Sequence, residues 1–100
     1  VLIDKVYSSE WCRCKETALI AFNKFGTKSF LNSFYDKKFK KNKYKQIKEL
    51  DNFIKNLKNE KNIVFVTHYV VISELLNISP ASGEIIITDI NLNIFDRIIF

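Results

Sequence analysis

Glycine and proline are scarce in this sequence, with two and one among 100 residues. Because these residues mark turns and loops, their scarcity argues against a chain built largely of long loops. No apolar run approaches the roughly 20 residues that a helix needs to cross a membrane. Apolar residues make up 47% and charged residues 27%, a composition typical of a folded domain rather than a disordered chain. A chain of 100 residues has room for one domain.

Cysteine and histidine, which often ligate metals, are also rare: the chain has two cysteines and one histidine. Cys12 and Cys14 lie two positions apart and would point in different directions on a helix, so we expect no disulfide between them. Neither has a set of nearby metal ligands, and no carboxylates show metal-binding spacing. We therefore expect both cysteines to be small packing residues, and we expect no metal and no cofactor. A reducing compartment is compatible with this pattern.

Methionine does not begin the chain, which opens with Val1 inside an apolar run (VLIDKVY). We interpret this as a natural N-terminus that was removed or never recorded. The sequence therefore carries no information on a signal peptide, and the location that we expect is cytoplasmic.

Positive charge exceeds negative charge, which gives the chain a formal net charge of +5. The excess lies in residues 37–48 (KKFKKNKYKQIK). These lysines indicate either a solvated helix face or a surface that binds nucleic acid or another anion. We favour the solvated face, because no DNA- or RNA-binding motif accompanies the lysines. Attraction of an anionic substrate is a milder use of the same charge.

The first half of the chain is predicted to contain a strand, two helices and a loop between the helices. The strand covers 5–8, and Ser9 is a good N-cap for a helix over 10–25 that Gly26 would end. Residues 27–42 are expected to form a packed loop with about one helical turn. The second helix covers 43–57. The expected apolar positions are Trp11, Cys14, Ala18, Phe22 and Phe25 in the first helix, Phe30, Leu31, Phe34, Tyr35 and Phe39 in the loop, and Tyr44, Ile47, Leu50, Ile54 and Leu57 in the second helix.

The second half begins with an unbroken apolar strand over 62–66, which is typical of a strand buried on both faces in a parallel sheet. A short helix over 70–76 and a turn at 80–83 follow. Strands over 84–88 and 92–100 are predicted to form a hairpin. Strands alternating with helices predict an α/β fold. We expect one three-layer α/β/α domain over 1–100, with a mostly parallel sheet and a C-terminal hairpin.

Two segments are predicted to meet at the carboxyl edge of this sheet, where open α/β sheets bind ligands. They are SSEWCRCKETA (8–18) and VTHYVVIS (66–73), and each contains a turn and a helix start that favours an anion. The Arg13 guanidinium could bind two phosphate oxygens, although it could also be an ordinary surface arginine. His68 could donate a hydrogen bond to a phosphoryl oxygen, although it could also be a hydrogen-bonded core residue. We predict that their side chains converge on one pocket.

The first of these segments resembles the SSPxxRAxxTA motif of the histidine phosphatase superfamily, which includes the phosphoglycerate mutases. The second, extended to VFVTHYVVISELL, resembles the second-histidine motif of that family, a hydrophobic strand followed by Gly or Thr and then His. Gly83 and Glu84, before a hydrophobic strand, are similar to the late Gly-Glu pair of the family. The resemblance covers about residues 6–88. It implies a partial phosphoglycerate mutase-like fold and a small phosphorylated substrate.

The resemblance also implies phosphomonoester hydrolysis or phosphoryl transfer through a phosphohistidine in the intact protein. Arg13 would be one of two arginines that grip the phosphoryl group, and His68 would be the second histidine, hydrogen-bonded to that group. Thr17 and Ala18 would support helix packing. The family nucleophile belongs to an Arg-His-Gly-like motif, and this chain has no second histidine. We expect that motif to precede Val1, so the chain alone should be inactive as an enzyme.

The sequence does not identify the general acid. Some family branches place an aspartate directly after the second histidine, where this chain has Tyr69. Other branches use a glutamate, and the candidates here are Glu10, Asp36 and Glu84, with Glu10 at a position where the motif often has proline. An alternative function is a catalytically inactive relative that binds a phosphorylated ligand or a protein. A third is a nucleic-acid-binding domain that uses the lysines.

Overall fold

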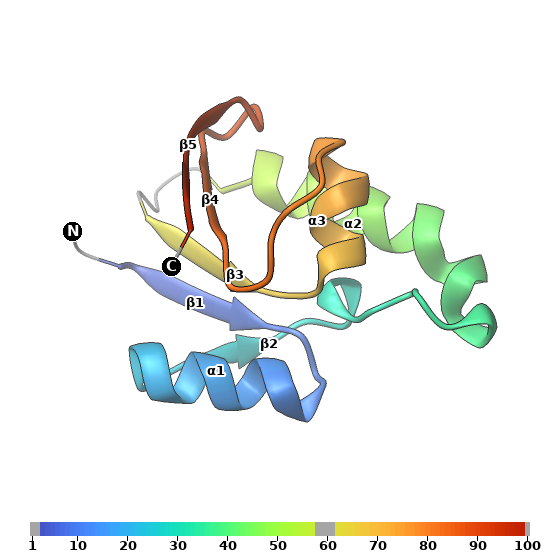
Figure 1. The fold of residues 1–100 in the computed structure, drawn as a ribbon, viewed down its shortest axis with the longest axis horizontal. Coiled ribbons are helices and arrows are strands. Elements are labelled where there is room, and N and C mark those ends of the chain that lie inside the picture. The colour runs from blue at the N-terminus through green and yellow to red at the C-terminus, as the bar shows by residue number, and fades with distance from the viewer. Residues whose placement is uncertain (1–2, 58–61, 100) are drawn as a thin grey trace.

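The computed structural model describes residues 3–57 and 62–99, apart from the side chain of residue 37 (Figure 1). The elements run in the order β1 (Lys5–Ser8), α1 (Cys12–Phe22), β2 (Gly26–Thr27), the 3-10 helices η1 (Ser29–Leu31) and η2 (Lys37–Asn42), α2 (Lys43–Lys55), β3 (Ile63–Val66), α3 (Tyr69–Leu76), β4 (Ile85–Thr88) and β5 (Ile94–Ile98). The predicted α/β class is confirmed. Helix α2 ends two residues before the predicted 57, and β3 starts one residue after the predicted 62. Residue 100, the predicted end of the last strand, lies outside the described residues.

A three-stranded parallel sheet in the order β2-β1-β3 forms the centre of the fold. Strands β1 and β3 pair in register from Lys5↔Ile63 to Ser8↔Val66, so they end at the same level. In Figure 1, α1 lies below the strands and α2 and α3 lie above them. The predicted parallel sheet is confirmed, and its carboxyl edge brings the starts of α1 and α3 toward the same region.

Helix α1 starts later and ends earlier than the predicted range of 10–25. Ser9 was predicted to be its N-cap, but the Ser9 hydroxyl accepts the N–H of Trp11 in a turn before the helix. Trp11 is the N-cap and makes no side-chain capping bond. Asn23 ends the helix by adopting a left-handed conformation with φ of 61°, which asparagine tolerates better than most residues.

Gly26, which was predicted to stop that helix, instead begins β2. It pairs with Tyr7 of β1, and the pairing extends to Ser8 and Thr27. The sequence prediction missed this strand because two residues carry too short a pattern to show a strand period. The rest of the predicted packed loop forms the two 3-10 helices. The lysine-rich segment therefore forms η2 and the first turns of α2.

The hydrophobic core lies between η1, α2 and α3. Its buried members are Phe30, Leu31, Phe34, Leu50, Ile54 and Val71. Burial of each such side chain contributes about 1.5–3 kcal/mol. The predicted apolar face of α2 is correct for Leu50 and Ile54. It is wrong for Tyr44, which is 83% exposed, because no neighbouring element covers the first turn of α2 at that position.

The predicted C-terminal hairpin is confirmed, with β4 and β5 antiparallel and paired from Ile85↔Ile98 to Thr88↔Ile94. The carboxylate of Asp89 holds the turn by accepting the N–H groups of Asn91 and Asn93. Within the described residues, this hairpin forms a sheet of its own and is not hydrogen-bonded to the parallel sheet. No helix in the described part of the chain is long and apolar enough to span a membrane.

Candidate phosphate-binding site

The two predicted segments meet at the carboxyl ends of β1 and β3. The N–H of Ser9 donates to the carbonyl of Val66 at 2.9 Å, which continues the pairing one residue beyond β1. The hydroxyl of Thr67 donates to the carbonyl of Leu31 at 2.6 Å. These two bonds fix the backbone directly before His68, which is the N-cap of α3.

The imidazole of His68 lies inside a small cluster formed by the start of α1. Its Nε2 atom is 2.9 Å from the Oγ of Ser9 and 3.6 Å from the Sγ of Cys14. The ring of Trp11 packs edge-on against the imidazole with 4.8 Å between ring centroids. The imidazole is therefore oriented by one hydrogen bond, a thiol and an aromatic wall. We call Ser9, Trp11, Cys14 and His68 the histidine cluster.

The hydrogen bonds of Ser9 determine which atom of His68 carries a proton. The Ser9 hydroxyl donates to Oδ1 of Asn32 at 3.0 Å and accepts the N–H of Trp11. Since a hydroxyl has a single proton, the bond to His68 requires Nε2 to be the donor, and we assign the Nε2–H tautomer on this basis. Asn32 is itself held by Glu10, whose N–H and carboxylate both bind its side-chain amide.

Arg13 lies on the first turn of α1, where its side chain is exposed. Burial lowers the pKa of His68, and the positive charge of Arg13 lowers that pKa further. Burial raises the pKa of the Cys14 thiol, while side-chain hydrogen bonding with Ser9 and the charge of Arg13 oppose this rise. The charge of Arg13 therefore acts on both groups, and neither Arg13 nor His68 is among the residues that line the pocket described below. At neutral pH, His68 is uncharged and Cys14 is a thiol.

The general-acid candidates lie in different surroundings. The carboxylate of Glu10 is hydrogen-bonded to Asn32 beside the histidine cluster, whereas that of Asp36 caps η2 by accepting the N–H of Lys38. Glu84 binds Arg97 through both carboxylate oxygens, at 2.6 and 2.9 Å.

The pKa of Glu84 is lowered. The hydrogen bonds from Arg97 are the largest cause, and the hydrogen bond from the N–H of Ala81 is the next. A general acid must hold a proton before it reacts. Glu84 is therefore poorly suited to the role, and Glu10 is the candidate that lies at the cluster.

Some residues of this site could not be identified from the sequence. No sequence pattern marked Asn32 as a site residue, because its contacts with Ser9 and Glu10 depend on how the segment after β2 folds. Trp11 was predicted as a core residue, but it is 41% exposed and forms a wall beside His68. Cys14 is buried as predicted, whereas Cys12 is exposed, so its predicted packing role is wrong.

The motif residues after Arg13 have structural roles. The hydroxyl of Thr17 donates to the carbonyl of Arg13 at 3.0 Å, and Ala18 is fully buried. Within residues 3–57 and 62–99, no group of three or more His, Cys, Asp and Glu side chains could hold a metal ion.

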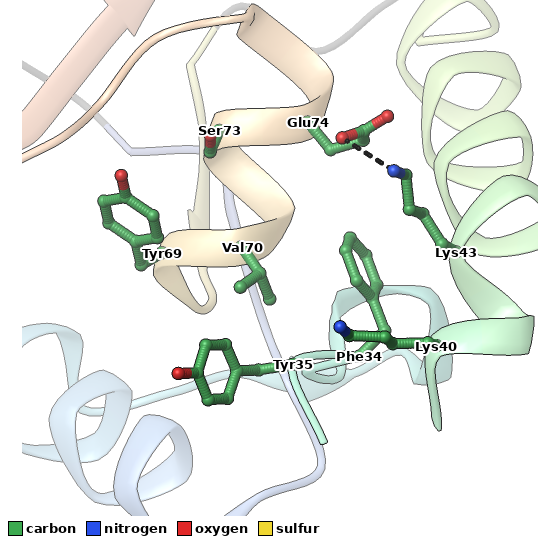
Figure 2. Close-up of a pocket in the computed structure, with 8 residues that line it drawn as sticks. All are labelled: Phe34, Tyr35, Lys40, Lys43, Tyr69, Val70, Ser73 and Glu74. Carbon is green, nitrogen blue, oxygen red and sulfur yellow. Dashed lines mark ion pairs between the residues drawn. The ribbon is translucent and has the colours of Figure 1, made fainter. Parts of the chain in front are cut away.

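A pocket of about 460 Å³ begins at Tyr69, the residue after His68 (Figure 2). It lies between α3, η2, the start of α2 and the segment after η1. The lining residues are Phe34, Tyr35, Lys40, Lys43, Tyr69, Val70, Ser73 and Glu74. Tyr69, at the position where the family resemblance would place a catalytic aspartate in some branches, is 54% exposed and lines this pocket.

Comparison with known proteins gives no match: no family model, no curated protein and no solved structure matches this chain. By its fold, the protein is a small α/β domain with a parallel sheet and a C-terminal hairpin.

Proposed function

We propose that this chain provides the phosphate-holding part of a histidine phosphatase-type site, which hydrolyses or transfers a phosphomonoester in the intact protein. The observation that carries the proposal is the position of Arg13 and His68 at the carboxyl ends of β1 and β3. The charge of Arg13 acts on His68 there, and two helices begin at that edge. Open α/β sheets bind ligands at this place, and helix N-termini favour anions.

The fold that goes with this proposal is a partial phosphoglycerate mutase-like fold in three layers. The position of α1 on one side of the strands, with α2 and α3 on the other, supports it (Figure 1). So does the order of the two motif segments, each of which follows a parallel strand.

In the proposed chemistry, Arg13 binds two phosphoryl oxygens through its planar guanidinium. His68 donates its Nε2–H to a third oxygen, a bond that strengthens as negative charge builds during transfer. The hydrogen bond to Ser9 holds this N–H in place before a ligand binds. The nucleophile is a histidine other than His68, which attacks phosphorus while the ester P–O bond breaks and the alcohol leaves with a proton. The phosphohistidine is then hydrolysed to release phosphate, or passes its phosphoryl group to an acceptor.

A second candidate function is the binding of a phosphorylated ligand without turnover. It is favoured by the surroundings of His68, because Ser9 and Trp11 fix the imidazole as a donor. An enzyme would transfer radioactive phosphate from a phosphomonoester to a histidine in the intact protein. A binding protein would retain the intact ester.

Titration of the chain with inorganic phosphate, followed by NMR, tests the common part of both functions. We expect shifts at Arg13 and His68 and a rise in the pKa of His68, since an anion favours the imidazolium ion. Arg13→Gln and His68→Gln should each weaken binding by at least about tenfold, because each removes a hydrogen bond to a charged group. Lys24→Gln removes an exposed charge outside the cluster and should change little. Equal binding by all these proteins would refute the proposal.

A further inference from the structure

The pocket beside the histidine cluster has aromatic and apolar walls. Phe34 is 5% exposed and forms its floor. Tyr35 and Tyr69 are 76% and 54% exposed and bring two phenol rings to the same side of the pocket, one from each wall (Figure 2). Val70 lies between them. Such walls suit a flat ring, because aromatic rings stack on or pack edge-to-face against each other.

Two walls of the pocket are formed by residues that follow the histidine cluster or its partner Asn32 in the chain. Tyr69 and Val70 follow His68 directly in α3. Phe34 and Tyr35 follow shortly after Asn32, which binds Ser9. Since consecutive Cα atoms lie about 3.8 Å apart, the pocket wall begins within one residue of His68. A group attached to a phosphate held at the start of α3 would therefore be within reach of this pocket.

The charges of the pocket do not cancel. Lys43 pairs with Glu74, with 3.3 Å between Nζ and Oε2. Lys40 extends its ammonium group toward Tyr35 (Figure 2), and within the described part of the chain no carboxylate forms an ion pair with it. The lining thus carries two lysines and one glutamate, which leaves one positive charge available to an anionic group.

We propose that this pocket binds the organic part of the phosphomonoester, and that this part is an aromatic ring with an anionic substituent. The inference rests on the proposed function, since the phosphate itself is placed at Arg13 and His68. Tyr35 and Tyr69 hold the ring, and Lys40 binds the anionic substituent. The lysine-rich segment therefore selects the substrate, in addition to providing general attraction for anions.

Binding of four compounds to the whole chain tests this inference: inorganic phosphate, cyclohexyl phosphate, phenyl phosphate and 4-carboxyphenyl phosphate. We expect affinity to rise in that order, with amide shifts at Tyr35, Tyr69 and Ser73. The carboxylate should add about fivefold, which is typical of a partly exposed ion pair.

Matched variants separate the two contributions. Lys40→Met should abolish the gain from the carboxylate, whereas Lys48→Met, at an exposed lysine outside the pocket, should preserve it. Tyr35→Ala should weaken both aryl phosphates by about fivefold and leave inorganic phosphate unchanged. Tyr44→Ala, at an exposed tyrosine of α2, should change none of them.

The possible failures are distinguishable. If inorganic phosphate binds through Arg13 but the aryl and carboxylate groups add nothing, the pocket inference is overturned and the proposed function stands. If 4-carboxyphenyl phosphate binds in a manner that depends on Lys40 but not on Arg13, the pocket inference is supported and the phosphate site is refuted. If none of the compounds binds, both are refuted.

Discussion

The Nε2 atom of His68 lies 2.9 Å from the Oγ of Ser9, although 59 positions separate the two residues in the sequence. The parallel pairing of β1 with β3 creates this contact, because both strands end at the same level. The Ser9 hydroxyl then fixes the imidazole as an Nε2–H donor. Arg13, four residues after Ser9, carries a positive charge that lowers the pKa of the imidazole.

Arg13→Gln should raise the pKa of His68. The native pKa lies below the ordinary histidine value of about 6.5, first because of burial and second because of the Arg13 charge. The variant removes only the second cause, so the pKa should rise toward that value without exceeding it. NMR titration of the imidazole protons measures this change. Lys15→Gln, at another cation of α1, serves as the control, and an unchanged pKa in Arg13→Gln would contradict the arrangement described.

Ser9→Ala should lower the free energy of unfolding by about 2 kcal/mol. The substitution leaves the N–H of Trp11 without its acceptor and removes one of the hydrogen bonds that hold the side chain of Asn32. Urea denaturation followed by the fluorescence of Trp11, the single tryptophan, provides the measurement. Ser82→Ala, at an exposed serine, should change stability by less than about 0.5 kcal/mol. Similar losses in both variants would show that the Ser9 network contributes nothing specific.

Leu50→Ala should destabilise the fold by about 3 kcal/mol, because it leaves a cavity between α2, η1 and α3. Leu19→Ala provides a matched control, since the same change occurs within a helix at a side chain that is 52% exposed. We expect a loss below about 1 kcal/mol there. Denaturant unfolding compares the two, and a larger loss for Leu19→Ala would place the core elsewhere.

Arg97→Gln should raise the pKa of Glu84, because Arg97 is the main cause of its lowered value. A carboxyl group whose pKa is lowered by folding stabilises the fold above its unfolded pKa, and this contribution is lost as the pH falls through the folded value. The variant should therefore be less stable than the native chain near pH 7 and nearly equal to it at pH 2–3. Denaturation at several pH values measures the difference. Arg97→Lys keeps the charge and should lie between the two, and a pH-independent difference would exclude this ion pair as its source.

Local patterns predicted much of the fold. The apolar run at 63–66 identified a parallel strand, and the helical spacing of Leu50 and Ile54 identified the buried face of α2. The alternation of strands and helices then placed Arg13 and His68 at the same sheet edge. These features depend on residues that are near one another in the chain, so the sequence alone contains them.

The tertiary structure determined the contacts between distant segments. Only the folded chain brings Asn32 to Ser9 and leaves Tyr44 uncovered. It also places Lys40 in a pocket next to His68. By itself, the sequence determined the order of the strands and α-helices apart from β2, and the two segments that carry the phosphate-binding candidates. The sequence did not determine that the Ser9 hydroxyl orients the imidazole or that Lys40 faces the pocket. Strand pairing and helix packing decided both, because these contacts join residues that are far apart in the sequence.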